Sequence, residues 1–477
     1  MTEATMRSAG VFGHPTGLFV LFATEACERF SYYGMRALLL FYLVDHFLMG
    51  DAGGTGVLAA YGAMVYALPI LGGIVADRWI GYRRAVIYGA LLLCCGHLLM
   101  AYEGEAATVV DGIVHRDETA RGVTFLALSF IVVGVGFLKP SITSMVGQLY
   151  ELDDPRRDQG FTIFYLGINL GAFVATLLVG WLGHRFGWSY GFGAAGVVMI
   201  GGISIFMWGR RHLGVSGVPR TPERLTARYA GLTPVQWILI GGAVGVFVTW
   251  MLLNNIASLG ILLIVLAVVS VAGVSAYAVL RCNPTDRDRL FIVLILTAVS
   301  SVFWALFEQM DKSVGLFAAR NVDLTFLGLS ITREQVTFLN PLMIIVFAPL
   351  FAMFWRGLSE RRAEPSTPLK FALGILHAGL AFLVMAAGKY FVDAGHQAGI
   401  IWLIGGFLLL TSGELCLSPG GLSMVTPFSP AGIVGLMMGI WFLATSIATY
   451  VSGLLARLAA VPGAVGIKVD PSVSLTI

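Results

Sequence analysis

The chain has 477 residues, of which 57% are hydrophobic and only 12% are charged. Soluble proteins carry about 25% charged residues, so this composition excludes an ordinary soluble domain and indicates a protein with many membrane spans. The net charge of +3 and the lack of any basic run argue against nucleic-acid binding. The five cysteines are not spaced as metal ligands, so we expect neither a metal site nor a disulfide framework.

Thirteen apolar stretches of the length that crosses a bilayer, about 20 residues, follow one another along the chain. The first six are 18–44, 56–76, 84–102, 122–149, 160–182 and 189–209. A pair at 235–253 and 256–280 comes next, and the last five are 290–310, 334–355, 369–392, 400–425 and 431–456. The N-terminus has no cleavable signal pattern, so we expect residues 18–44 to be retained as a span.

The loops predict the orientation and the division of the chain. Loops on the side of the N-terminus hold 18 Lys and Arg residues and the opposite loops hold 9, which predicts a cytoplasmic N-terminus; a register shifted by one span would reverse it. We expect an N-terminal bundle at 1–209, a linker with an inserted transmembrane hairpin at 210–289, and a C-terminal bundle at 290–477. The C-terminal bundle is one span short, so we expect a truncated chain.

The first span is unusually rich in ionisable residues, each of which costs about 2.5–3.5 kcal/mol inside a membrane. On a helix with about 100° per residue, its polar side chains fall within one arc of about 140°. They are Glu25, Glu28, Arg29, Tyr32, Tyr33 and Arg36. We therefore expect this face to meet protein or a wet cavity, and the remaining apolar face to meet lipid.

Three later spans carry isolated charges, Lys139, Glu308 and Glu414. Arg29 can pair with a glutamate of its own helix, whereas Arg36 and Lys139 then have only the two carboxylates of the C-terminal half as partners. We expect such pairs to form and break as the two halves rock. For any one of these charges, a structural ion pair that fixes helix register is the alternative.

The segment after the second span, Gly72-Gly73-Ile74-Val75-Ala76-Asp77-Arg78-Trp79-Ile80-Gly81-Tyr82-Arg83-Arg84, resembles the loop signature of the major facilitator superfamily. Its glycines allow close approach of helices. A loop that is merely positive on the cytoplasmic side would explain the arginines but not the glycine-Asp-Arg-glycine spacing. The resemblance implies that Asp77 and Arg78 act in conformational gating.

Two longer motifs resemble those of the proton-dependent oligopeptide transporter family: Glu25-x-x-Glu28-Arg29-Phe30-Ser31-Tyr32-Tyr33-Gly34 and the FYxxINxG pattern at 164–171. Shorter matches follow in order, namely Lys139-Pro140, Phe303-Trp304 with Glu308-Gln309, Asn340-Pro341, and Gly413-Glu414 with Ser418-Pro419. The resemblance covers residues 12–452. It implies an all-α membrane protein with the major facilitator superfamily fold, which is two six-helix bundles with an extra helical hairpin between them, here without the last helix.

The function that this resemblance implies is proton-coupled symport of di- and tripeptides into the cytoplasm by alternating access, and not an enzymatic reaction. The implied proton-coupling residues are Glu25, Glu28, Arg29 and Glu308. The implied substrate-binding residues are Arg36, Tyr32, Tyr33, Tyr66, Lys139, Asn169, Trp304, Asn340, Glu414, Ser418 and Trp441. The implied gating residues are Arg36 with Glu308, Lys139 with Glu414, and Asp77 with Arg78.

Chemistry alone gives a similar assignment, because a zwitterionic peptide brings one negative and one positive end. Arg36 and Lys139 can bind the carboxylate, and Glu414 the amino group. For Tyr66 and Trp441, an interfacial aromatic residue is the alternative. For Asn340, the alternative is an Asn-Pro pair that breaks a helix.

The sequence departs from the family at two places. Phe307 replaces a second acidic residue that many bacterial members carry, and the second span lacks the histidine of mammalian members. We expect His97, in the third span, to be a core residue. The implied partners are di- and tripeptides, protons and the lipid bilayer, with no nucleic acid, no metal and no cofactor besides the co-transported protons.

The expected location is the cytoplasmic (inner) membrane of a bacterium, in which the chain is a multi-pass monomer. Two other functions stay open. The first is a symporter of another solute such as nitrate, for which Glu414 would have no amino group to bind. The second is a membrane receptor without transport, for which no titratable cluster would be needed.

Overall fold

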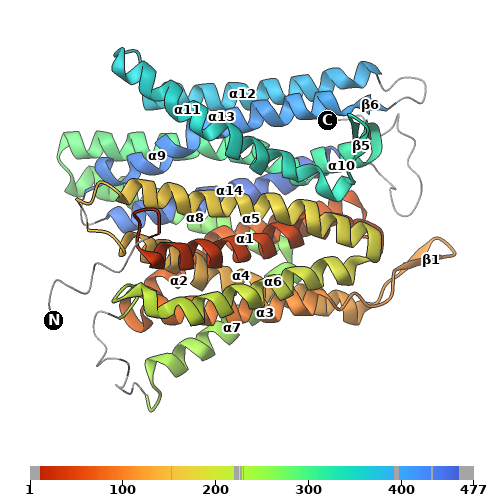
Figure 1. Ribbon diagram of the computed structural model, residues 1–477, viewed down its shortest axis with the longest axis horizontal. Coiled ribbons are helices and arrows are strands. Elements are labelled where there is room, and N and C mark those ends of the chain that lie inside the picture. Colours follow the sequence, from red (N-terminus) through yellow and green to blue (C-terminus); the bar gives the residue numbers. More distant parts are fainter. Residues whose placement is uncertain are drawn as a thin grey trace. The chain divides into compact units, whose positions relative to one another are not determined.

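The computed structural model describes residues 11–151, 153–219, 225, 228, 230–391, 397–430 and 433–460. All thirteen predicted spans fall on helices (Figure 1). The first six are α1 (Thr16–Phe41), α2 (Gly50–Val75), α3 (Tyr82–Met100), α4 (Glu118–Gly147), α5 (Arg157–Phe186) and α6 (Trp188–Gly209). The inserted pair is α7 (Pro234–Asn254) and α8 (Ile256–Arg281), and the last five are α9 (Pro284–Phe307), α11 (Leu339–Glu360), α12 (Thr367–Ala387), α13 (Ile400–Phe428) and α14 (Val434–Leu458).

Twelve helical segments within the described residues are long and apolar enough to cross a membrane. The remaining predicted span, α1, is 26 residues long but carries four charged side chains. None of the residues of α1 is exposed, but several apolar ones, such as Phe22 and Ala23, are only half-buried, so an apolar face turned to lipid stays a prediction. The inserted helices do face outwards, with exposed apolar side chains such as Ile264 and Val268 on α8.

The elements that the sequence did not predict are short. Two π-helical turns, Tyr42–His46 and Ala76–Ile80, extend α1 and α2. A short helix, α10 (Ser313–Asn321), follows the 3-10 turn at the end of α9. Strands β1 (Thr108–Val110) and β2 (Ile113–His115) form an antiparallel hairpin, β3 (Val322–Asp323) pairs in parallel with β6 (Ala398–Gly399), and β4 (Thr325–Phe326) pairs with β5 (Leu329–Ser330).

The contacts divide the chain into two compact units, which are described separately. Unit 1 comprises the described residues of Met1–Leu38, Ala67–Ala106 and Arg116–Asn254. Unit 2 comprises those of Leu39–Tyr66, Ala107–His115 and Asn255–Ile477. The units are defined by contacts between residues, so α1 and α2 each contribute residues to both units. The predicted domain boundaries at residues 209 and 289 divide the chain by sequence position instead, and they stay predictions.

Close packing in unit 1 depends on glycines at the helix contacts. A Cβ on Gly89 of α3 would lie 2.6 Å from the carbonyl oxygen of Gly134 on α4. A Cβ on Gly72 of α2 would collide with the carbonyl group of Gly136. The prediction that the glycines of the loop motif allow close approach of helices is therefore confirmed at Gly72. This packing brings α4, which carries Lys139, into the centre of the unit.

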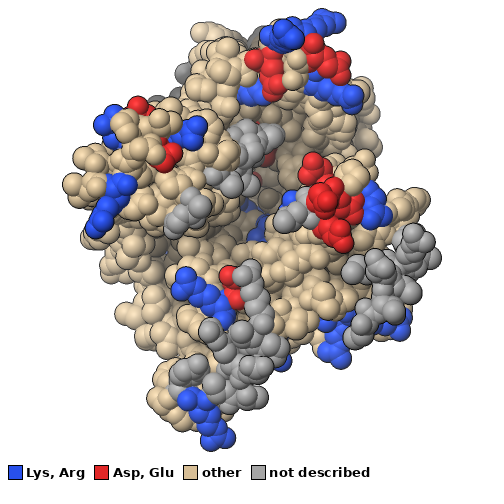
Figure 2. All heavy atoms as spheres, turned by 90° about the vertical axis from the view of Figure 1, so that its left-hand side faces the viewer, with Lys and Arg blue, Asp and Glu red and all other residues tan. Residues whose placement is uncertain are grey.

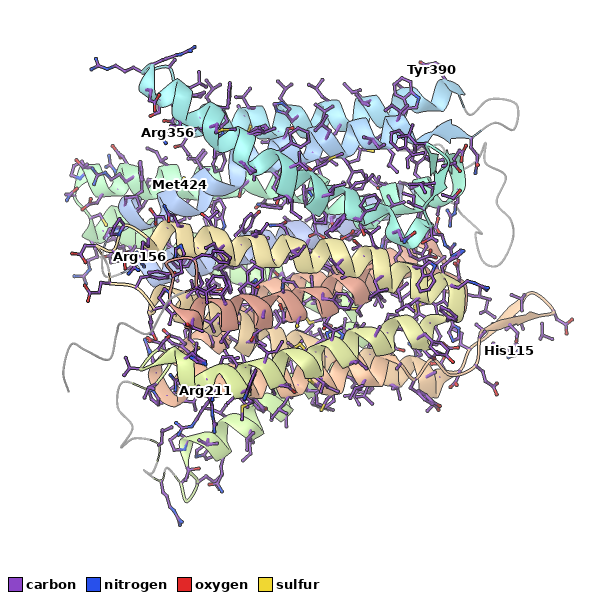
Figure 3. All side chains as sticks on the ribbon, in the orientation of Figure 1. His115, Arg156, Arg211, Arg356, Tyr390 and Met424 are labelled. Atoms are coloured by element: carbon purple, nitrogen blue, oxygen red, sulfur yellow. The ribbon has the colours of Figure 1, made fainter. Side chains whose placement is uncertain are left out.

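Unit 2 has a hydrophobic core in which α9, α12 and α13 meet. Phe303, Phe371 and Phe407 are fully buried there. The charged side chains lie mainly at the helix ends. Figure 2 shows one such end, where acidic and basic side chains form clusters on a face that is otherwise largely uncharged. Within unit 2, Arg356 and Tyr390 mark opposite ends of the helices (Figure 3).

Candidate functional site

The polar face of α1 forms a buried charge cluster in unit 1. Arg29 donates from Nε and Nη2 to the two carboxylate oxygens of Glu28, and the Nη2–Oε1 distance is 2.6 Å. The Nε atom of Arg29 also lies 3.7 Å from the Glu25 carboxylate, one helical turn away. Both glutamates are buried, and the second oxygen of Glu25, Oε2, has no hydrogen-bond partner among the described residues. The prediction that Arg29 pairs within its own helix is confirmed.

A second cation reaches this cluster from α4. The Nζ atom of Lys139 forms an ion pair with Oε1 of Glu25. The interpretation that Lys139 has only the carboxylates of the C-terminal half as partners is therefore wrong. The physical reason is the close packing of helices in unit 1, which the charge pattern of single spans does not reveal. The gating pair of Lys139 with Glu414 stays a prediction, and it requires Lys139 to leave Glu25.

Two aromatic rings surround the guanidinium group of Arg29. Its carbon Cζ lies 4.8 Å from the ring centre of Tyr32 and 5.8 Å from that of Tyr33. Such contacts stabilise a cation in a dry site. The hydroxyl of Tyr32 also accepts a hydrogen bond of 3.3 Å from Nη1 of Arg36. The polar arc predicted for α1 is thus one connected network, as its spacing indicated.

The end of α9 holds an ion pair that the sequence analysis missed. Lys312 is one of the nine Lys and Arg residues counted in the loops opposite the N-terminus, but its side chain is 0% exposed. Its Nζ atom lies 2.9 Å from Oε2 of Glu308 and donates to the carbonyl of the same residue at 3.1 Å. The 3-10 turn Glu308–Asp311 ends α9 and brings Lys312 back over Glu308. The spacing of four residues between opposite charges was the available signal.

Glu414 lies on α13 in unit 2, opposite the start of α11. Its Oε2 atom accepts a hydrogen bond of 3.1 Å from Nδ2 of Asn340, which also donates to Thr411. Asn340 precedes Pro341 in the first turn of α11, where a proline is tolerated. The two predicted substrate residues are thus in contact, and a carboxylate with one neutral donor can still accept from a cation.

The predicted aromatic residues of unit 2 have different surroundings. Trp304 packs against Phe303 and Phe307, with ring centres 5.4 Å and 5.3 Å apart. Phe307 therefore supports Trp304. The Nε1 atom of Trp304 is buried and has no hydrogen-bond partner among the described residues. Trp441 is buried in the hydrophobic core, and its role as a pocket wall stays a prediction.

The remaining predicted substrate residues are placed as follows. Asn169 is buried on α5 and donates to the carbonyl of Tyr165 in its own helix at 3.1 Å. Tyr66 is half-buried on α2. Ser418 lies on α13, but its side chain is outside the described part of the structure. The substrate contacts of these three residues stay predictions.

In the loop motif after α2, a residue other than the predicted gating residues makes the longer-range contacts, and the gating role of Asp77 and Arg78 stays a prediction. Asp77 accepts a hydrogen bond of 3.0 Å from the hydroxyl of Tyr82, and Arg78 is exposed. Arg83 makes the longer-range contacts, because its guanidinium donates to the carbonyl groups of Ser216 at 2.7 Å and Gly214 at 2.5 Å. The linker after α6 is therefore fixed against the start of α3 by Arg83.

The turn between α1 and α2 is held within unit 2 by ion pairs that sequence reasoning also missed. Arg320 of α10 donates to both oxygens of Asp51, at 2.7 Å and 2.6 Å, and Asp51 is only 2% exposed. Arg333 pairs with Asp45, and its guanidinium carbon lies 4.5 Å from the ring centre of Phe41. Both contacts join segments more than 260 residues apart, for which local patterns give no signal.

The charge balance of unit 1 limits what its cluster can do. Glu25 and Glu28 are matched by Lys139 and Arg29, and an unmatched charge here would cost several kcal/mol. A proton bound to Glu25 would release Lys139 from its partner. The lysine could then bind another carboxylate. The cluster can therefore couple the binding of a proton to the binding of an anion.

Comparisons with known proteins agree on one family. A family model described as the POT family matches residues 83–470. A transporter of Bacillus subtilis (strain 168), YclF, is 38% identical over 94% of this chain and 89% of its own length. A di-/tripeptide transporter of Lactococcus lactis subsp. lactis (strain IL1403) is 35% identical over 91% of this chain and 88% of its own. The crystal structure of a mutant of the peptide transporter POT in complex with alafosfalin has a TM-score of 0.79 and 37% identity, and covers 95% of this chain and 90% of that chain.

Proposed function

The chain belongs to the POT family, and from this premise we propose that it imports di- and tripeptides together with protons by alternating access. It is a multi-pass membrane protein of a family of transporters and not an enzyme. The name of the Lactococcus relative, a di-/tripeptide transporter, supports this class of substrate. The peptide transporter POT with bound alafosfalin supports a site for peptide-like compounds in this fold.

The observation that carries the proposal is the ion pair of Lys139 with Glu25, next to the pair of Arg29 with Glu28. In the proposed cycle, a proton from outside binds to Glu25 and frees Lys139. The freed ammonium group and Arg36 bind the carboxylate of the peptide. Return of Lys139 to Glu25 on the inner side expels both the proton and the peptide.

The amino group of the peptide binds Glu414, which Asn340 holds at 3.1 Å. A charged amino group gives a stronger hydrogen bond to a carboxylate than the neutral amide does. Tyr32, Tyr33 and Trp304 form walls for varied side chains, because aromatic surfaces accept them without demanding hydrogen bonds. Protons are the only other solute that this cycle requires.

The transporter works as a monomer in the cytoplasmic membrane of a bacterium, with a cytoplasmic N-terminus. The two-to-one bias of Lys and Arg between the loops supports this orientation. Closure of the outer side involves Glu308 and Arg36, and the ion pair of Asp51 with Arg320 holds the α1–α2 turn in the closed form. Opening of the outer side requires these four charged residues to change partners.

Uptake by proteoliposomes tests the function. The purified protein should accumulate labelled dialanine above the external concentration when the outside is acidic, and only equilibrate it without a gradient. Unlabelled tripeptides should compete, whereas nitrate and N-acetyl-dialanine should compete weakly. Equilibration without accumulation under the gradient would contradict symport. Competition by nitrate and none by tripeptides would instead indicate a symporter of another solute.

A further inference from the structure

His97 on α3 is a buried histidine whose two ring nitrogens are unpartnered. It is 1% exposed, and neither Nδ1 nor Nε2 has a hydrogen-bond partner among the described residues. A neutral imidazole carries one donor and one acceptor, and leaving either unpaired in a dry interior is energetically costly. The prediction that His97 is a core residue describes its burial but not this cost. Buried polar atoms without partners point to an internal water or a proton.

The packing on α6 places His97 and Glu28 at similar depth. The hydroxyl of Ser31 on α1 donates to the carbonyl of Ala195 at 2.7 Å. A Cβ on the next residue of α6, Gly196, would lie 2.9 Å from Leu98 of α3. Ser31 and Leu98 thus share one level. His97 and Glu28 are one and three residues away from that level, an offset of about 5 Å or less at 1.5 Å per residue.

Charged groups at this depth lie on α1. The carboxylate of Glu28 is there, and it is bound by Arg29. Glu25 is the next carboxylate along α1, and its Oε2 atom is likewise buried without a hydrogen-bond partner among the described residues. Both α4 and α6 pack on α3, and α6 carries no charged residue. On α4 the charged residues are Lys139, which binds Glu25, and Glu118 and Arg121 near its start.

We infer that His97 is a further proton-binding residue of this transporter, which shares the proton of the coupling step with Glu25 through internal water. The proton binds the free nitrogen of the neutral ring and gives an imidazolium ion at a depth similar to that of the Glu28 carboxylate. Its release inwards restores the neutral ring, and no other bond is formed or broken. The unpartnered Oε2 atom of Glu25 offers an acceptor for the same water. The inference rests on the proposed proton coupling and adds a residue to it.

Two substitutions of His97 separate proton binding from packing. His97→Asn keeps a hydrogen-bond donor and acceptor but cannot titrate near neutral pH, and His97→Leu removes both properties. The matched control is His377→Asn, because His377 lies on α12 and its Nδ1 atom already has a partner, the carbonyl of Leu373 at 2.7 Å. Each variant is compared in gradient-driven uptake of dialanine and in counterflow exchange, which needs no net proton transfer.

Both His97 variants should lose gradient-driven uptake by at least about tenfold. They should keep counterflow within about twofold of the parent protein. The control His377→Asn should keep both gradient-driven uptake and counterflow within about twofold. Normal gradient-driven uptake by His97→Asn would overturn the inference. Equal loss of uptake and counterflow in both variants would also overturn it, because it would assign His97 a role in packing. If the unmodified protein itself shows no gradient-driven uptake, the proposed function fails instead.

Discussion

Lys139 on α4 and Glu25 on α1, 114 residues apart in the sequence, form an ion pair in unit 1 in which Glu25 is fully buried and Lys139 is half-buried. Together with the neighbouring pair of Arg29 and Glu28, this contact leaves two carboxylates and two cations in balance. Any change of protonation or partner disturbs that balance. The predictions below follow from this and from three comparable contacts in unit 2.

The first prediction concerns the stability of the Lys139–Glu25 pair. Glu25→Gln should lower the free energy of unfolding by about 1–3 kcal/mol, because it leaves the half-buried Lys139 ammonium without a counter-charge. The double variant Glu25→Gln/Lys139→Met should recover most of this loss while gradient-driven uptake stays absent. Thermal unfolding in detergent measures the first effect and proteoliposome uptake the second.

The exposed pair of Arg121 with Glu118, on the same helix as Lys139, is the control. Glu118→Gln should change stability by no more than about 1 kcal/mol, as is usual for surface pairs. If Glu25→Gln is as mild as Glu118→Gln, the buried pair does not hold the cluster together.

A second prediction follows from the fully buried Lys312. Glu308→Gln should be strongly destabilising and should reduce counterflow, because it leaves Lys312 charged in a site without water. Lys312→Met should suppress both defects when it is combined with Glu308→Gln. A double-mutant cycle on the thermal midpoints should give a coupling energy of about 0.5–3 kcal/mol. Additive effects of the two substitutions would show that Glu308 has another principal partner.

The third prediction concerns the bidentate contact between Asp51 and Arg320. Asp51→Asn should weaken the closed form of the α1–α2 turn, and labelling of a cysteine at the buried Val314 of α10 should rise about tenfold for a loss of about 1.4 kcal/mol. The charge exchange Asp51→Arg/Arg320→Asp should restore slow labelling. The assay uses a membrane-impermeant maleimide on a variant without the native cysteines.

Unchanged labelling in Asp51→Asn would show that this ion pair does not hold the closed form. The exposed pair of Arg356 with Glu360 on α11 provides the matched control, because its nitrogen–oxygen distance of 3.0 Å is similar but both side chains face water. Exchange of those two charges should leave the labelling rate unchanged.

The fourth prediction tests recognition of the peptide amino group by Glu414. Glu414→Gln should weaken the binding of free dipeptides by about 10-fold or more, because a charged hydrogen bond contributes about 1.5–3 kcal/mol. It should change the binding of N-acetylated dipeptides by no more than about twofold. Inhibition of counterflow by each compound gives both affinities. An equal loss for the two classes of peptide would exclude contact between Glu414 and the amino group.

The helices could be predicted from the sequence because their signal is local. Each span is a run of apolar residues of the required length, and the polar arc of α1 follows from the helical period alone. The glycines of the loop motif also predicted close approach correctly, as the contact of Gly72 with α4 shows. Motif resemblance then assigned Glu25 to proton coupling, and Lys139 and Glu414 to substrate binding and gating.

The partners of the charged residues could not be predicted in the same way. Lys139 meets Glu25 only because α4 packs against α1, and single-span reasoning assigned it a partner in the other half. Lys312 seemed to lie in a loop because a 3-10 turn at the end of α9 was not recognised. Asp51 and Arg320 lie in different halves of the chain, and nothing in either segment specifies the other.

The central claim is that each peptide enters together with protons, and proton flux on addition of peptide tests it most directly. Proteoliposomes that contain a pH-sensitive dye are clamped at zero membrane potential with valinomycin and potassium and start with equal pH on both sides. Addition of dialanine outside should acidify the interior, and the acidification should be absent in Glu25→Gln and on addition of N-acetyl-dialanine. Entry of labelled dialanine into the same vesicles without acidification would contradict proton-coupled transport.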